Sequence, residues 1–420
     1  MVKFIHAADL HLDRSFEGLV GMNRNSQMEF LKVNQKVLEN LVDIAITEEI
    51  DCLILAGDTF HQSRPSLRTQ KHFFEQMTRL SEKQIPVFLI FGNHDYYQSD
   101  RYWFEFPENV ALFTSETVET KQWVTRHGES IAISGFSYTN QWLQRTKVDE
   151  FPPRFQVDIH LGIYHGELGK AGNYAPFQLA DMTQKGYDYW ALGHIHVPTE
   201  LSLQPPIIYP GTPQGHSQKE ERVAGVLLVE IQQGEVIKKA VPIAEVAWIT
   251  KEVSLKNCRT SQEALAQMAQ TDQIGHSVES TDQGLQSNQR ALIQLKLKDF
   301  EQLGTDFQTS IENHEVVQYL LDKTQQRMSD SYPNASLVWS IELVHQSDER
   351  KIKVETSREL ANQLFSVYHD PEQFQQILSE IYSHPIAHRL VAESKEFQQE
   401  VLQKAQQQID ADFTMGGSEI

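Results

Sequence analysis

Short apolar runs alternate with segments of helical spacing through the first hundred residues of this 420-residue chain. Apolar runs of strand length lie at residues 2–8, 53–56 and 86–91. The segments between them, 26–48 and 67–83, carry apolar residues every three to four positions, which is the period of an amphipathic helix. Strands and helices that alternate in this way predict an α/β core, with helices packed on a largely parallel sheet.

The pattern changes further along the chain. Residues 110–136 carry shorter apolar runs separated by turns, which indicates added strands in a more antiparallel part of the sheet. Residues 224–231 and 236–241 predict a hairpin that closes a first domain. Beyond Pro242 strand and helix patterns alternate again, with strands expected at 246–256, 290–298 and 337–345 and helices near 260–270 and 312–329.

From residue 355 onward the apolar spacing is helical, and one face of the last helix is apolar while the other is rich in Gln, Glu and Lys. Such a helix either packs on its own protein or docks a partner, and the pattern does not decide between the two. We expect four regions: a first domain at 1–242, a small α+β domain at 243–350, a helical partner-docking region at 351–412 and a flexible tail at 413–420.

Polar residues with metal-binding side chains follow five of the strand-like runs. In open α/β sheets a ligand site lies outside the carboxyl ends of the strands, so these residues are expected to meet in one pocket. Residues i and i+2 of an extended chain face the same side, so the Asp-x-His and His-x-His pairs can each share one ion. The residues are Asp9 and His11, Asp58, Asn93 with His94 and Asp95, His165, and His194 with His196.

The number and type of these donors suit two divalent ions rather than one. Oxygen and imidazole donors without a thiolate favour manganese, iron or zinc over a closed structural zinc site. Gly57, Gly92 and Gly193 stand beside the donors, where they let the backbone turn sharply and approach the ions.

The order Asp-x-His, Gly-Asp, Gly-Asn-His-Asp, a lone His and Gly-His-x-His resembles the calcineurin-like binuclear metallophosphoesterases. Within that superfamily, the segments at 8–12, 57–66 and 209–215 are similar to the SbcD-type DNA repair nucleases, particularly the YhaO-type bacterial branch. Five ordered motifs are far more specific than any one of them. The resemblance covers roughly residues 1–240 and implies a β-sandwich flanked by helices, followed by a small α+β capping domain and C-terminal helices.

The resemblance also implies the roles of individual residues. One ion is expected on Asp9, His11, Asp58 and His196, and the other on Asp58, Asn93, His165 and His194. His94 is expected to protonate the leaving sugar oxygen, Asp95 to orient the imidazole of His94, and His61 to contact the scissile phosphate or the DNA strand. Arg14 and Arg64 are candidates for substrate binding, with a solvated loop face as the alternative.

The remaining histidines, such as His6, His127, His160 and His216, are interpreted as structural. Tyr138, Trp142 and Phe151, in a segment near the site, are interpreted as packing residues rather than as a platform for stacking bases.

The implied function is a metal-dependent DNA exonuclease, with single-strand endonuclease activity, that works in double-strand-break repair with an SMC-like, SbcC-type coiled-coil ATPase. Manganese is the expected metal, with iron, zinc and magnesium as alternatives. Two other functions remain open: a phosphodiesterase or phosphatase for small substrates, and a non-catalytic scaffold for the ATPase. Whether the chain forms a homodimer is also open.

Charge and composition modify this picture. The formal net charge of −20 disfavours long-range attraction of DNA, although bound cations or a partner can supply positive charge. Two cysteines, Cys52 and Cys258, are too few for a disulfide framework. No apolar run reaches the roughly 20 residues of a membrane span, and the N-terminus enters strand-like sequence at once, so a cytoplasmic location without membrane contact is expected.

Overall fold

The computed structural model describes residues 1–17, 24–220, 225–271, 289–330 and 336–344. The chain divides into two compact units, Met1–His345 and Gln346–Ile420. The second unit contains the expected docking region at 351–412 and the tail at 413–420, and both lie outside the described residues.

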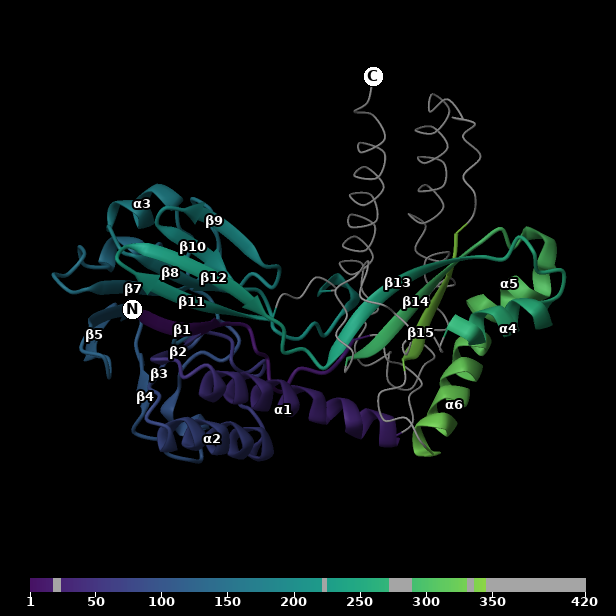
Figure 1. Ribbon diagram of the computed structural model, residues 1–420. Helices are drawn as coiled ribbons and strands as arrows, with labels where there is room; N and C mark the ends of the chain where they lie inside the picture. Colours follow the sequence, from purple (N-terminus) through teal and green to yellow (C-terminus); the bar gives the residue numbers. More distant parts are fainter. Residues whose placement is uncertain (18–23, 221–224, 272–288, 331–335, 345–420) are drawn as a thin grey trace, which may run out of the picture. The chain divides into compact units, whose positions relative to one another are not determined.

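The first sheet holds the strands that the opening pattern predicts, in the order β12-β11-β1-β2-β3-β4 (Figure 1). Strands β1 to β4 are parallel, whereas β11 runs antiparallel to both β1 and β12. The predicted hairpin is therefore confirmed, and it forms one edge of this sheet. The bounds are β1 Val2–Ala7, β2 Cys52–Ala56, β3 Val87–Ile90, β4 Val110–Leu112, β11 Val226–Gln232 and β12 Glu235–Val241.

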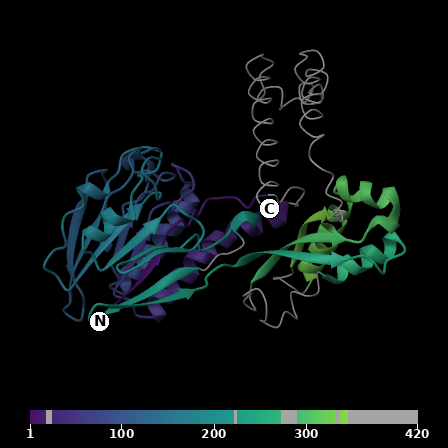
Figure 2. The same cartoon turned by 90° about the horizontal axis from the view of Figure 1, so that it is seen from above.

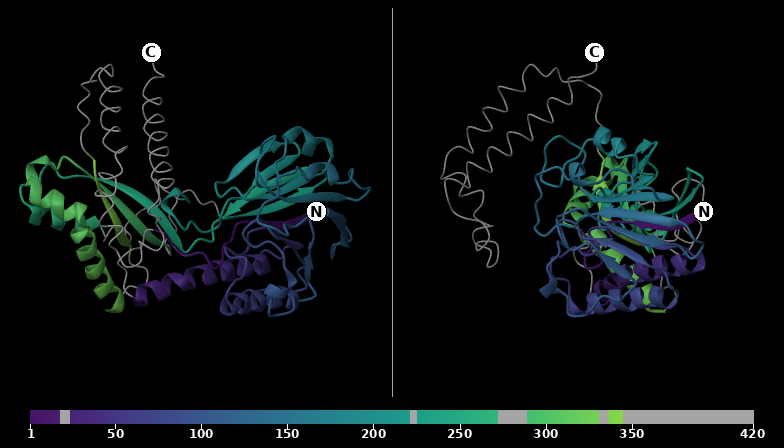
Figure 3. Two further views of the ribbon diagram at one scale, coloured as in Figure 1. Left: turned by 180° about the vertical axis from the view of Figure 1, so that it is seen from behind. Right: turned by 90° about the vertical axis from the view of Figure 1, so that its left-hand side faces the viewer.

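Helices α1 (Arg24–Thr47) and α2 (Leu67–Glu82) lie side by side against this sheet (Figure 3). Helix α2 begins where the Ser66 hydroxyl accepts the backbone N–H of Thr69 at 3.1 Å, which satisfies one of the free donors at the helix start. Its buried face, which includes Phe73, Met77 and Leu80, packs on apolar side chains of the central strands. The predicted strand–helix alternation is confirmed here.

A second sheet follows, with the order β5-β6-β7-β8-β10-β9. Its inner strands β6, β7, β8 and β10 are parallel, and its two edge strands are antiparallel to their neighbours. The bounds are β5 Glu119–Val124, β6 Ser130–Gly135, β7 Ile159–His165, β8 Tyr189–Gly193, β9 Thr199–Leu203 and β10 Pro206–Tyr209, with helix α3 at Leu179–Gln184.

The apolar pattern by itself suggested one sheet, but these strands form two mixed sheets, and residues 110–136 are divided between them. Apolar side chains from both sheets, among them Phe4, Ile54, Ile133 and Leu161, form one shared core. Strands that are buried on both faces read as continuous apolar runs, so the pattern predicts the strands but not the sheet that each one joins. The two stacked sheets match the sandwich that the resemblance implies.

A third sheet contains the parallel strands β13 (Val246–Ser254), β14 (Arg290–Lys298) and β15 (Leu337–Leu343). Helices α5 and α6 lie along these strands (Figure 2). The helices are α4 Ser261–Thr271, α5 Gly304–Glu312 and α6 Glu315–Asp330, and short 3-10 helices lie at Ser99–Arg101, Val148–Glu150, Gln218–Glu220 and Glu301–Leu303. The predicted elements beyond residue 242 are present, while the domain boundary itself stays a prediction. Among the described helices, none has the length and apolarity needed to cross a membrane.

Candidate metal centre

The expected ligands meet where β1, β2, β3, β7 and β8 end, at the carboxyl edge of both sheets. Backbone hydrogen bonds join the loops: Asp9 N–H donates to the Gly57 carbonyl and His11 N–H to the Asp58 carbonyl, both at 3.1 Å. Asp9, His11 and Asp58 have positive φ values of 52°, 43° and 50°. Each such conformation costs on the order of 1–3 kcal/mol and persists only where neighbouring contacts enforce it. The backbone is therefore bent to aim these side chains at one point.

One group of donors consists of Asp9, His11 and His196, whose ligand atoms all lie within 4.8 Å of one another. The Nε2 atoms of His11 and His196 are 3.1 Å apart. His11 is fully buried, and so is Asp9, which accepts the backbone N–H of His194 through both carboxylate oxygens at 3.1 and 3.0 Å.

The other group is centred on Asp58 and His165, both buried. Asp58, His165 and Asp9 also have ligand atoms within 4.8 Å of one another. His165 Nε2 lies 3.1 Å from Asn93 Oδ1, and that oxygen is also 3.1 Å from His194 Nδ1. All seven residues expected as ligands are therefore brought together.

Asp58 faces both groups. Its Oδ2 lies 3.4 Å from His165 Nε2 and 3.9 Å from His11 Nε2, while its Oδ1 accepts the backbone N–H of His94 at 2.9 Å. A carboxylate in this position suits the bridging role expected of it. Asp9 belongs to both groups as well, a proximity that the motif order did not reveal.

The hydrogen-bond pattern fits cations in this pocket. His165 Nδ1 lies 3.0 Å from the Ala56 carbonyl, which can only accept, so Nδ1 carries the proton of the neutral ring. The lone pair of Nε2 then faces two oxygen atoms, Oδ1 of Asn93 and Oδ2 of Asp58. Such a cluster of acceptors is repulsive unless a proton or a metal ion neutralises it. Imidazole, amide and carboxylate donors without sulfur fit divalent manganese, iron or zinc.

The pKa values show the same charge imbalance. Burial lowers the pKa of His165, but the neighbouring Asp58 carboxylate outweighs burial and the pKa rises to about 9. Burial raises the pKa of Asp9 to about 6, against the opposing effect of His165 and His196. For Asp58, burial is outweighed by His165 and His11, so the pKa falls far below its ordinary value. The protein thus holds a buried anion among imidazoles, as a cation site requires.

Two glycines keep space open beside the donors. A Cβ atom on Gly92 would lie 2.2 Å from Asp58 Oδ1, and one on Gly193 would lie 2.0 Å from the Ala56 carbonyl oxygen and 2.8 Å from His165 Nδ1. Any larger residue at either position would displace a ligand or the backbone that orients it.

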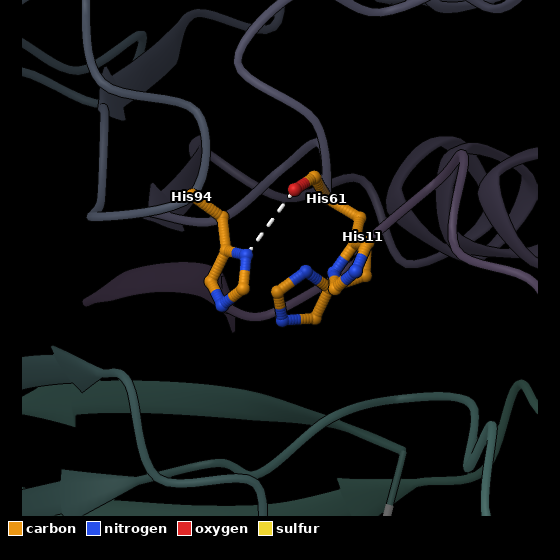
Figure 4. Close-up of side chains that lie close together, drawn as sticks. All are labelled: His11, His61 and His94. Carbon is orange, nitrogen blue, oxygen red and sulfur yellow. Dashed lines mark hydrogen bonds between the residues drawn. The ribbon is translucent and has the colours of Figure 1, made fainter. Parts of the chain in front are cut away.

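His61 and His94, both partly exposed, lie beside the buried His11, and ligand atoms of the three histidines lie within 4.8 Å of one another (Figure 4). The His61 and His94 rings stack with centroids 4.7 Å apart, and His94 Nδ1 donates to the His61 carbonyl at 3.2 Å. His94 Nε2 is therefore the ring nitrogen that remains for a substrate. Their catalytic roles stay predictions, and their position at the partly exposed rim is compatible with those roles.

The Asp95 carboxylate has hydrogen-bond partners other than the His94 ring. Its carboxylate accepts backbone N–H groups of Gly92, Thr59 and Phe60 at 2.7, 2.8 and 3.3 Å, and the His94 imidazole instead uses the carbonyl of His61. Asp95 therefore ties together the two loops that carry Asp58 and Asn93, because a buried carboxylate is best satisfied by several backbone donors. The expected contact between Asp95 and the His94 ring is not the one found.

Arg14 and Arg64 are the candidates for substrate binding. The Arg14 guanidinium lies near the centre but is held by Glu17 at 2.7 Å and by Glu220 at 2.6 Å. Arg64 is exposed in the loop that follows His61. Substrate binding by either residue stays a prediction.

Glu220 is a residue of the site that sequence reasoning missed. Its Oε1 lies 2.5 Å from His196 Nδ1, and its Oε2 accepts the backbone N–H of His216 at 2.7 Å. The side chain is only 8% exposed. Glu220 lies in a polar stretch 24 residues after His196, and the nearby sequence signal is the family-like segment at 209–215, which ends five residues earlier.

The histidines interpreted as structural have internal partners where the structure shows them buried. His6 contacts the Tyr189 hydroxyl and the Leu192 carbonyl, each at 3.0 Å. His160 contacts Ser134 Oγ at 2.8 Å, and His216 contacts Asn34 Oδ1 at 2.9 Å.

Comparison with known proteins identifies the family of this chain. Residues 2–198 match the calcineurin-like phosphoesterase family, and through these residues the chain belongs to that family. It is 34% identical over 271 residues to a protein of Bacillus subtilis named as the uncharacterized metallophosphoesterase YhaO. The alignment covers 64% of this chain and 66% of YhaO.

More distant relatives have names that refer to DNA or to a nuclease. The chain is 27% identical to the DNA double-strand break repair protein Mre11 of Methanopyrus kandleri, over 60% of this chain and 59% of that protein. It is 25% identical to a component of the nuclease SbcCD of Bacillus subtilis, over 56% of this chain and 67% of that protein. The chain thus spans about two thirds or less of the length of these relatives.

Proposed function

We propose that this protein is a two-metal phosphodiesterase that cleaves DNA. The observation that carries the proposal is the pair of donor groups, Asp9, His11 and His196 on one side and Asp9, Asp58 and His165 on the other, which converge on one partly open pocket. A phosphoesterase family with this donor arrangement hydrolyses phosphate esters, so the reaction class follows from the family and the site together.

Two divalent ions, with manganese proposed and iron, zinc or magnesium as alternatives, would supply an activated water and stabilise charge on the phosphate. The first would be held by Asp9, His11, Asp58 and His196, and the second by Asp58, Asn93, His165 and His194.

The protein's own groups do the remaining work. His94 presents Nε2 at the pocket rim, because its Nδ1 is engaged by the His61 carbonyl, and from there it delivers a proton to the leaving sugar oxygen. The His61 ring stacks on that of His94 and fixes its plane. The Asp95 carboxylate holds both ligand-bearing loops at their backbone, which keeps the donors in place before substrate arrives.

DNA as the substrate is supported by the names of the relatives in the Mre11 and SbcCD families and by the segment at 57–66, which resembles theirs. The name of the Bacillus subtilis nuclease relative makes it one part of a larger assembly. We accordingly propose a coiled-coil ATPase of the SbcC type as the partner of this chain, with residues 351–412 as the docking region.

The test is hydrolysis of end-labelled single-stranded and duplex DNA beside bis-p-nitrophenyl phosphate, with the protein loaded with Mn²⁺ and with EDTA as the control. Cleavage of both substrates that EDTA abolishes supports the proposal. Cleavage of the small diester alone would show that the protein is a phosphodiesterase whose substrate is not DNA. If the protein holds metal but cleaves neither substrate, the proposal that it is an enzyme is wrong.

A further inference from the structure

The segment that follows β6 contains three aromatic residues interpreted from the sequence as packing residues. The structure separates them: Tyr138 and Phe151 are 0% and 2% exposed, whereas Trp142 is 58% exposed. Tyr138 and Phe151 belong to the core on the outer face of the second sheet. The Trp142 indole therefore contributes little to that core and presents much of its surface to solvent.

Trp142 borders a surface pocket of about 830 Å³. This volume lies within the roughly 300–1,000 Å³ of pockets that hold small organic ligands. The lining combines the apolar Trp142 and Leu143 with the amides of Asn140, Gln144 and Asn173. We call this the Trp142 pocket.

The Trp142 pocket is built from the same backbone that walls the metal centre. Leu143 N–H donates to the Asn173 carbonyl at 2.9 Å, and Ala175 N–H donates to the Leu143 carbonyl at 2.6 Å. Tyr174, between these two partners, places its ring against that of His194 with centroids 4.5 Å apart. Asn173, which lines the pocket, is thus adjacent in the chain to Tyr174, whose ring contacts the candidate ligand His194.

A second connection runs through Tyr138. Its hydroxyl donates to the His165 carbonyl at 3.1 Å, and its backbone N–H donates to the Phe91 carbonyl at 3.0 Å. The segment that carries Trp142 is thereby anchored to both strand ends that deliver His165 and Asn93. The Trp142 pocket and the metal centre are neighbouring features of one wall.

The polar groups of the Trp142 pocket suit the edge of a base better than a phosphate. Arg145 is the basic residue of its lining, and its guanidinium lies 3.6 Å from Glu116 and 3.8 Å from Glu150. Two carboxylates offset that charge and repel a phosphate. The Gln144 side-chain N–H donates to Asn173 Oδ1 at 2.9 Å. The remaining polar atoms of these amides can bind the hydrogen-bond groups on a base, while an exposed indole offers a face for stacking.

We propose that the Trp142 pocket binds an unpaired base of a DNA strand whose phosphate lies at the metal centre. This inference rests on the proposed function, because it takes DNA as the substrate. It also addresses the net charge of −20, since a chain with this charge gains little from attraction to phosphates. Stacking on an aromatic ring strengthens binding by about 5- to 150-fold per base and tolerates any base sequence.

The experiment measures binding of labelled oligodeoxythymidine to the full Mn²⁺-loaded protein by fluorescence anisotropy, beside an oligonucleotide with the same phosphates but abasic sugars. The variants are Trp142→Ala and Trp142→Phe. The matched control is Trp103→Ala, because Trp103 is 66% exposed and does not line the pocket. Hydrolysis of bis-p-nitrophenyl phosphate by each variant verifies that the metal centre is intact.

We expect Trp142→Ala to weaken binding of the thymidine strand by about 5- to 150-fold, the equivalent of one stacked base. Binding of the abasic strand and hydrolysis of the small diester should stay within about twofold of the parent protein. Trp142→Phe should retain most of the affinity, and Trp103→Ala all of it.

Equal binding of the thymidine strand by the parent protein and Trp142→Ala would overturn the proposal, and so would equal losses on the thymidine and abasic strands. Free thymidine monophosphate is added as a competitor. If it displaces the labelled strand at a concentration equal to that of the strand, the pocket binds a free nucleotide, and the proposal of a base within a DNA strand is overturned. If the parent protein cleaves the diester but neither binds nor cleaves DNA, the proposal of DNA as the substrate is wrong. This inference, which rests on that proposal, is then wrong as well.

Discussion

Nδ1 of His196 lies 2.5 Å from Oε1 of Glu220, and the same oxygen accepts a hydrogen bond from Arg14 at 2.6 Å. A carboxylate only accepts, so this contact places the imidazole proton of His196 on Nδ1 and turns the lone pair of Nε2 toward His11. Carboxylates that contact ligand histidines in this way fix the ring and raise its basicity. In the proposed metal site, Glu220 would therefore orient His196 as a ligand.

Replacement of Glu220 should weaken metal binding. We expect Glu220→Ala to lower Mn²⁺ affinity by about 10- to 100-fold, since the His196 ring loses the partner that sets its tautomer. Isothermal titration with Mn²⁺ measures the effect. Glu17→Ala is the matched control, because Glu17 holds the same Arg14 but is 63% exposed and makes no contact with His196. Equal losses in the two variants would assign the effect to Arg14 instead.

Ligation and proton transfer should separate in two variants of the site. Asp58 faces both donor groups, so Asp58→Ala should abolish metal occupancy and activity together. His94→Ala should leave both ions bound and slow hydrolysis of a phosphodiester by about 10²- to 10⁴-fold. Metal content and rate are measured on the same preparations. A metal-free His94→Ala protein would show that His94 is a ligand and not the acid.

A methyl group on Gly92 should empty the site. The Cβ of Gly92→Ala would lie 2.2 Å from Asp58 Oδ1 and 2.7 Å from the His165 ring, so one of these donors must move. We expect loss of bound Mn²⁺ by elemental analysis. Gly128→Ala is the comparison: its φ of +94° makes alanine costly for stability there, but nothing lies within 4 Å of the new Cβ. Full metal occupancy in Gly92→Ala would refute the argument.

Asp95 should matter for stability as well as for rate. Asp95→Ala leaves three buried backbone N–H groups of Gly92, Thr59 and Phe60 without their acceptor. We expect the free energy of unfolding to fall by about 3 kcal/mol or more, measured in urea. A residue that only orients the His94 ring would instead lower the rate and leave the unfolding midpoint unchanged. The two measurements on one variant distinguish these roles.

Local sequence was sufficient for the parts of this protein that depend on neighbours in the chain. The apolar runs predicted β1, β2 and β3, the helical spacing predicted α1 and α2, and the turn at residues 232–235 predicted the hairpin. The ligand candidates were also visible, because each stands at or within a few residues of a strand end, and strand ends converge at one edge of a parallel sheet.

Only the tertiary structure decided which residues far apart in the sequence contact each other. His11 and His196 meet across 185 residues, and the Asp95 carboxylate finds backbone donors 36 and 35 residues away rather than the adjacent His94 ring. Apolar residues have the same pattern in either sheet, so that pattern did not show the division into two stacked sheets, which was expected only from the family resemblance. The sequence also did not show which side chains are exposed. Tyr138 and Trp142 are four residues apart and similar in hydrophobicity, yet the first is buried beneath His165 and the second faces solvent.

The physical reason is common to all of these cases. Burial and hydrogen-bond partners depend on which segments pack together. The sequence gives the chemistry of each residue, but it does not say which residues pack against it.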